Sequence, residues 1–185
     1  IKTVFKSTCF AFIFAITLSG CTQNEARFQL MSSSQTGVEF NNTISESDTM
    51  NVLLFEYLYN GAGVGTGDFN NDGLTDIFFA GNMVSCRLYL NRGDFKFEDI
   101  KVSAGLETKL WCTGVDLSDI NQDGLLDIYV STSHPKEKEK SPNLLFLNKG
   151  LDNNKSPVFE EVAAKTGLAD SSYSTQAAFL DYDLD

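Results

Sequence analysis

The sequence predicts an all-β fold built from repeated small sheets, and three observations support this. From Asn51 onward, short β-rich runs alternate with Gly, Asn and Asp, as strands joined by tight turns do. An acidic loop that begins at Asp68 runs into an apolar strand, and the same order recurs from Asp119. Each unit holds three or four short strands over about 50 to 60 residues, close to the length of a β-propeller blade.

The composition is that of a foldable acidic protein. The chain has 185 residues, 42% of them hydrophobic, which suits one or two domains. Its formal net charge of −11 argues against nucleic-acid binding, which needs a basic surface.

Residues 1–20 are expected to be a signal peptide. Lys2 and Lys6 precede the apolar run Cys9–Leu18, which is too short for a membrane span of about 20 residues. Leu18-Ser19-Gly20-Cys21 resembles the lipobox of bacterial lipoproteins, which implies cleavage before Cys21 and acylation of its thiol. Two or more acyl chains would anchor the exported protein to the outer membrane or cell surface. The alternative is an ordinary signal peptide with an incidental cysteine.

Residues 21–50 are polar and are interpreted as a tether, with one short strand near Val38–Phe40. The repeat region, residues 51–185, follows. A Gly-rich stretch, residues 61–67, is expected to be an inner strand, because Gly allows neighbouring backbones to approach closely. It does not fit a G-x-G-x-x-G nucleotide motif, since Thr66 occupies a glycine position.

The strands after each acidic loop are predicted in the same order. They are Asp76–Ala80, Arg87–Asn91 and Phe95–Ile100 after the first loop, and Asp127–Ser131, Asn143–Asn148 and Val158–Val162 after the second. A third unit opens at Ala177. Two blades and the start of a third would not close a ring of about four to eight blades. The sequence is therefore expected to be the N-terminal part of a longer propeller, with a small independent β-domain as the alternative.

The acidic loops have the pattern D-x-[DN]-x-D-G-x-x-D, which points to a metal site. Gly73 and Gly124 are expected to adopt positive φ, so that a backbone carbonyl can join the ligands. Oxygen-only ligands suit Ca²⁺, whose coordination is flexible. The loops lack the Glu at position twelve of an EF-hand and have strand-like flanks. The expected ligands are Asp68, Asn70, Asp72, Leu74 and Asp76 in the first loop, and Asp119, Asn121, Asp123, Leu125 and Asp127 in the second. The alternative is an acidic turn without metal.

The loops and the strands that follow them resemble FG-GAP/VCBS repeats, the calcium-binding blades of integrin-α-type propellers. A closer resemblance is to VCBS-repeat lipoproteins that often carry a C-terminal ASPIC/UnbV domain, and it rests on the first loop together with Tyr59–Val64, Leu88–Asn91, Phe97–Ile100 and Ala104–Leu106. The resemblance implies a seven-bladed propeller with calcium in its hairpin loops. Two departures are an insert at Ser133–Ser141 and an incomplete third loop. That loop offers Asp181, Asp183 and Asp185 as further ligands.

Cys86 and Cys112 remain once Cys9 and Cys21 are assigned to the signal region. An oxidising compartment permits a disulfide between them, and two buried free thiols are the alternative.

Two classes of function remain open. The first is a non-catalytic calcium-binding scaffold of the envelope that recognises a protein or glycan. It follows from the loops, the anchor and the lack of a catalytic set around the only histidine, His134. The second is the propeller portion of a larger extracellular carbohydrate-active or hydrolytic enzyme. Trp111, just before the second inner strand, is expected in the blade core or lining a funnel.

Overall fold

The computed structural model describes residues 28–100, 104–133 and 141–183. The chain divides into two compact parts, residues 1–31 and residues 32–185. Of the N-terminal part only residues 28–31 are described, and they form no helix or strand. All that follows concerns residues 32–185.

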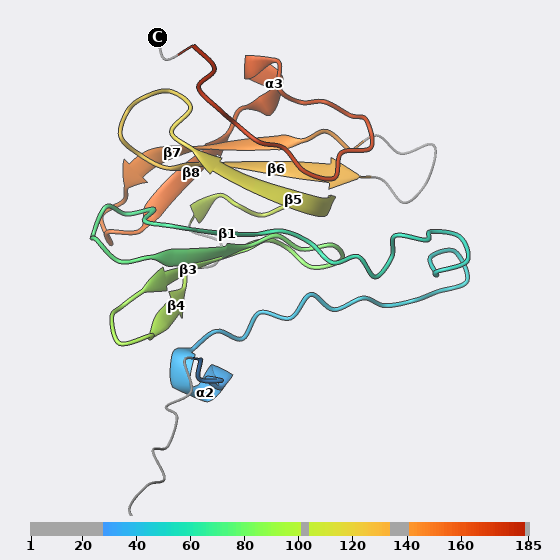
Figure 1. The fold of residues 1–185 in the computed structure, drawn as a ribbon, viewed down its shortest axis with the longest axis horizontal. Coiled ribbons are helices and arrows are strands. Elements are labelled where there is room, and N and C mark those ends of the chain that lie inside the picture. The colour runs from blue at the N-terminus through green and yellow to red at the C-terminus, as the bar shows by residue number, and fades with distance from the viewer. Residues whose placement is uncertain (1–27, 101–103, 134–140, 184–185) are drawn as a thin grey trace, which may run out of the picture. The chain divides into compact units, whose positions relative to one another are not determined.

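Residues 32–185 contain two four-stranded antiparallel sheets (Figure 1), in the strand orders β1-β2-β3-β4 and β5-β6-β7-β8. The all-β prediction is therefore confirmed, and each sheet has the meander of a propeller blade. The strands are β1 (Val64–Gly67), β2 (Asp76–Phe79), β3 (Arg87–Asn91), β4 (Phe97–Asp99), β5 (Trp111–Ser118), β6 (Asp127–Ser133), β7 (Leu144–Leu151) and β8 (Pro157–Glu161).

The alternation of side chains along a strand puts a hydrophobic core between the two sheets. In β6, Ile128 and Val130 are fully buried in a cluster that contains Phe78 and Leu88 of the first sheet. Tyr129, between them, points to the opposite face and joins a separate cluster with Leu145. The second sheet is thus apolar on both faces, as a blade that packs between neighbours must be.

Two glycines at equivalent positions let successive units approach at their inner strands. A Cβ on Gly63 would lie 2.6 Å from the Val115 backbone nitrogen, in β5. A Cβ on Gly114 would lie 2.6 Å from the Thr175 carbonyl oxygen, in the segment after the second sheet. The expectation that Gly serves close backbone approach here is confirmed.

A short connector ends with a left-handed glycine before each unit. The helices α2 (Ser33–Thr36) and α3 (Ala163–Thr166) end at Gly37 and Gly167, with φ of 80° and 78°. Gly105 has φ of 75°, and a Cβ there would lie 2.5 Å from the carbonyl oxygen of Phe159 in β8. A Cβ on Gly37 would lie equally close to the carbonyl oxygen of Phe97 in β4. Residues 32–37 therefore pack on the first sheet as Gly105 packs on the second, inside the stretch that the sequence predicts to be a tether.

The short strand expected near Val38–Phe40 does not form, so that prediction is wrong. Side chains rather than a strand ladder hold this segment. The Phe40 ring stacks on Phe79 with centroids 4.8 Å apart, and the Glu39 backbone N–H donates to the Tyr89 hydroxyl at 3.3 Å.

The first unit carries an extra segment between its connector and its acidic loop. Asp68 follows Gly37 by 31 positions, whereas Asp119 follows Gly105, and Asp181 follows Gly167, by 14. The additional residues lie before β1 and form a small core in which Phe55 and Leu58 pack against Trp111. This segment emerges at the end of the strands away from the acidic loops (Figure 1).

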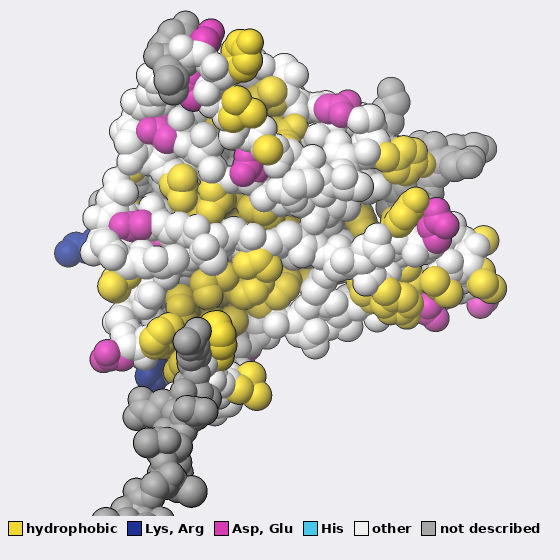
Figure 2. All heavy atoms as spheres, viewed as in Figure 1, with side chains coloured by type: hydrophobic (Ala, Val, Ile, Leu, Met, Phe, Trp, Pro, Cys, Tyr) yellow, Lys and Arg dark blue, Asp and Glu magenta, His cyan; other side chains and the backbone are white. Residues whose placement is uncertain are grey.

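The segment after α3 runs beside β5 without forming a strand in its described residues. The Gln176 side chain donates to the Val115 carbonyl at 2.9 Å, and the Phe179 backbone N–H donates to the Asp116 carboxylate at 2.6 Å. Coverage of the two sheets differs: Val64 is 54% exposed, whereas its counterpart Val115 is 9% exposed. Figure 2 shows hydrophobic side chains exposed over the first sheet.

Candidate metal-binding loops

Each acidic loop joins the first two strands of its sheet, β1 to β2 and β5 to β6. The predicted turn is present in both: φ is +86° at Gly73 and +83° at Gly124. Asn71 and Gln122, two positions earlier, also have positive φ, at 54° and 57°. A left-handed conformation at a non-glycine residue costs free energy, and its recurrence at the same position indicates that the loops share one backbone course.

The first acid of each loop binds the backbone across the turn. Asp68 Oδ1 accepts the N–H of Asp72 at 3.1 Å, and its Oδ2 accepts the N–H of Gly73 at 2.8 Å. In the second loop, Asp119 makes the corresponding bonds to Asp123 and Gly124 at 3.0 and 2.8 Å.

The middle positions bond to one another and to the backbone of the turn. Asn70 donates through Nδ2 to Asp72 Oδ2 at 2.9 Å, and Asp72 Oδ1 accepts the Leu74 N–H at 2.9 Å. Asn121, Asp123 and Leu125 repeat both bonds at 2.9 Å. The loop thus gathers carboxylate and amide oxygens within a single turn, twice and with nearly equal distances.

The closing acids, Asp76 and Asp127, are fully buried and begin the second strand of each sheet. Asp76 accepts the backbone N–H of Phe69 at 3.0 Å and that of Asn91 at 2.8 Å, with one oxygen for each. Asp127 accepts the N–H groups of Ile120 and Asn148 at 2.9 and 2.8 Å.

These two acids therefore tie the start of the loop to the third strand, in addition to any role as a ligand. From the sequence the two acids are expected only as ligands, although each stands at the start of an apolar strand, where burial is the usual outcome.

Burial raises the pKa of the Asp76 carboxyl group above its ordinary value, while the two backbone N–H groups oppose that rise. The charges of Asp72 and Asp68 raise the pKa of Asp76 further. Burial raises the pKa of Asp127 in the same way, with Asp123 and Asp119 adding to it. Repulsion among the acids thus disfavours the ionised form, and a bound cation would favour it.

The two loops lie side by side at one end of the sheets. Asn71 donates through Nδ2 to the Gly124 carbonyl at 3.2 Å, and the buried Asn148 donates to the Phe69 carbonyl at 2.9 Å. Six aspartates are therefore collected in adjacent turns. They are Asp68, Asp72, Asp76, Asp119, Asp123 and Asp127.

The donor set of each loop fits a hard cation by its chemistry. It offers carboxylates, an amide oxygen and the carbonyl of Leu74 or Leu125, with no nitrogen or sulfur. A carboxylate oxygen that accepts one N–H keeps a further lone pair. Among the described residues, no three Asp, Glu, His or Cys side chains already converge as a preformed metal cluster. Calcium binding by these loops stays a prediction.

The third loop is only partly described. Asp181 and Asp183 are exposed, and Asp185 lies outside the described residues. Their role as ligands likewise stays a prediction.

Cys86 and Cys112 lie side by side in the core between the sheets. Their Sγ atoms are 3.7 Å apart, and both thiols are buried and free in this structure. The structure therefore brings the two cysteines together without a covalent bond between them, and the disulfide stays a prediction.

The predicted signal peptide, the lipidation site Cys21 and His134 lie outside the described residues. Within the described part of the chain, no helix has the length and apolar character needed to cross a bilayer.

Comparison with protein families gives one match, to the family described as FG-GAP-like repeat, over residues 68–130. The matched stretch begins at the first acid of the first loop and ends within β6, so it includes both acidic loops. Comparison with curated proteins gives no match. Residues 68–130 thus form an FG-GAP-like repeat, in agreement with the all-β architecture of two blade-like sheets.

Proposed function

We propose that the protein is a non-catalytic, calcium-binding propeller scaffold of the bacterial envelope that binds a protein or a glycan. The observation that carries the proposal is the acidic loop, which occurs twice with the same backbone course and the same internal bonds. An incidental acidic turn would have no reason to keep matching oxygen positions in two successive units.

Calcium explains why the acids are concentrated in these loops. Close like charges repel one another at every plausible dielectric, and a divalent cation converts that repulsion into attraction. Asp68, Asn70 and Asp72 would hold the ion together with the Leu74 carbonyl, and Asp76 would close the set from the strand. The bound ion would neutralise the loop and hold the hairpin in place.

The partly uncovered apolar face of the first sheet supports the propeller form of the scaffold. The apolar face of the first sheet that carries Val64 and Phe79 is less covered than the equivalent face of the second sheet. Another FG-GAP-like unit against that face would bury it as the first sheet buries Val115. The number of seven blades rests on the family resemblance alone.

Export and lipid anchoring through Cys21 rest on the sequence of the first 21 residues. The acidic composition suits an exterior scaffold, and the face in Figure 2 shows scattered acids and few basic side chains. Mass spectrometry of the mature protein should find a lipid-modified N-terminal cysteine. An unmodified N-terminus that is the same in Cys21→Ser would refute the anchor.

A disulfide between Cys86 and Cys112 would join the two sheets covalently in an oxidising compartment. Their separation of 3.7 Å requires only a small movement to reach the bonded distance of about 2.05 Å. Peptide mapping without reductant should recover the linked pair. Two free thiols in protein taken from the periplasm would refute the bond.

Titration calorimetry tests the calcium proposal directly. The chelator-treated protein should take up two calcium ions per chain at millimolar calcium or below. Asp72→Asn and Asp123→Asn should each remove one ion, since each replaces one carboxylate of one loop.

Asp48→Asn is the matched control, because Asp48 is an exposed acid outside both loops. It should leave the uptake at two ions. No calcium uptake by the unaltered chain, or equal uptake by all variants, would contradict the proposal.

A further inference from the structure

A pocket of about 560 Å³ lies at the end of the strands opposite the acidic loops. Three successive parts of the chain contribute to it: the extra segment before β1, the paired strands β5 and β6, and the segment after α3. This volume lies within the range of about 300–1,000 Å³ found for small-molecule sites. Its lining residues are Phe55, Tyr57, Asn60, Gly61, Trp111, Thr113, Ser133, Tyr173 and Thr175.

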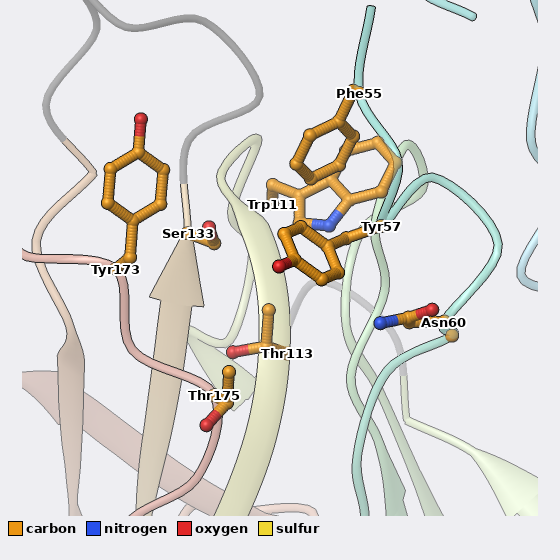
Figure 3. Close-up of a pocket in the computed structure, with 9 residues that line it drawn as sticks. Phe55, Tyr57, Asn60, Trp111, Thr113, Ser133, Tyr173 and Thr175 are labelled. Atoms are coloured by element: carbon orange, nitrogen blue, oxygen red, sulfur yellow. The ribbon is translucent and has the colours of Figure 1, made fainter. Parts of the chain in front are cut away.

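Four aromatic rings shape the pocket. Phe55 and Trp111 are 8% and 6% exposed and pack edge to face with ring centroids 5.3 Å apart, so they form a rigid base. Tyr57 and Tyr173 are 56% and 60% exposed and stand on opposite sides of the opening (Figure 3). Two buried rings and two accessible ones offer flat surfaces to a guest molecule.

Neutral polar groups lie between these rings. The side chains of Asn60, Ser133 and Thr175, and the indole N–H of Trp111, make no hydrogen bond to any described residue. Thr113 differs, because its hydroxyl is engaged with the carbonyls of Ser131 and Ser174, at 3.0 and 2.8 Å. A purely apolar guest would remove the available donors and acceptors from water without replacing their hydrogen bonds, which is unfavourable.

Among the described residues, no charged side chain lines the pocket, although the chain carries 39 Asp, Glu, Lys and Arg residues. A charged guest would therefore be buried without a partner.

The extra segment of the first unit supplies Phe55 and Tyr57, and insertions in repeat proteins often build the binding face.

We propose that this pocket binds a neutral carbohydrate of one or two sugar rings. The C–H faces of a sugar carry partial positive charge and pack on the negative faces of aromatic rings, while its hydroxyl groups bond to neutral donors and acceptors. The rings of Tyr57 and Tyr173 hold the sugar from the two sides, and Trp111 contacts it from the base. This deepens the proposed binding function by naming a ligand class, and it does not depend on calcium uptake.

Trp111 makes the test direct, because it is the only tryptophan of the chain and its emission reports on the pocket. The full chain is titrated with cellobiose, maltose, lactose and N,N′-diacetylchitobiose up to about 10 mM, so that millimolar affinity is detected. At least one sugar should change the Trp111 emission saturably, with matching heat in calorimetry. Tyr173→Ala and Tyr57→Ala should each weaken that binding by about tenfold or more.

Tyr59→Ala is the matched control, since Tyr59 lies on the same segment, is 63% exposed and does not line the pocket. It should bind as the unaltered chain does. No response to any of the four sugars, or equal binding by Tyr173→Ala and Tyr59→Ala, would overturn the inference. Binding of an apolar dye at Trp111 that no sugar displaces would also overturn it, in favour of an apolar ligand.

Repeating the titration with calcium and with chelator separates the two proposals. Sugar binding without calcium uptake would contradict only the calcium proposal. Calcium uptake without sugar binding would contradict only the pocket inference.

Discussion

Asp76 serves the fold, and under the calcium proposal it would also be a metal ligand. Its two carboxylate oxygens accept the backbone N–H groups of Phe69 and Asn91 inside the protein. Of the remaining acids of the loop, Asp68 is half-buried and Asp72 is exposed, and both bond only within the turn. The acids of one motif therefore differ in what they do without a cation: the buried acid organises the hairpin, and the other two bond only within the turn.

This division predicts different effects for the same substitution at two positions. In chelator, Asp76→Asn should lower the free energy of unfolding by about 1–3 kcal/mol, because the amide nitrogen cannot accept the N–H that an oxygen accepted. Asp72→Asn should change it by only about 0.5 kcal/mol or less, since its side chain is exposed. Urea unfolding of both variants measures the difference. Equal losses would contradict the separate role of Asp76.

At the scale of elements, the turn conformation of the loops and the strand order could be predicted from sequence, because both depend on local patterns. The D-x-N-x-D-G spacing specifies the turn, and period-two burial marks the strands that follow. The role of residues 32–42 could not be predicted, because Phe40 is held by Phe79, which lies far along the chain. The pocket could not be predicted for the same reason, although the sequence places Trp111 in the blade core or in the lining of a funnel.

The approach of successive inner strands gives a prediction for two glycines of the first unit. Gly63→Ala should destabilise the protein by about 3 kcal/mol, because its Cβ would collide with the backbone at Val115. Gly65→Ala is the control: the nearest atoms, 3.0 Å away, are ends of the Leu117 and Val115 side chains, which can move. Its cost should stay below about 1 kcal/mol. Thermal unfolding compares the two, and an equal or greater loss in Gly65→Ala would refute this view of the packing.

For the whole molecule, the sheets are joined through a common core and through the contact between the two acidic loops. The Asn71 side chain bonds to Gly124, and Asn148 bonds to Phe69, so that order in one loop supports order in the other. Any ion bound there would act on both sheets. Calcium binding should therefore raise the stability of both sheets together.

The melting temperature in calcium and in chelator tests this account most directly. A ligand that binds only the folded state at a hundredfold excess over its Kd stabilises it by about 2.7 kcal/mol per site. For a chain of this size, each kcal/mol raises the melting temperature by about 2–4 °C, so each loop should contribute about 5–10 °C. The double variant Asp72→Asn/Asp123→Asn should lose this calcium-dependent rise. A melting temperature of the unaltered protein that is the same in calcium and in chelator would contradict the account.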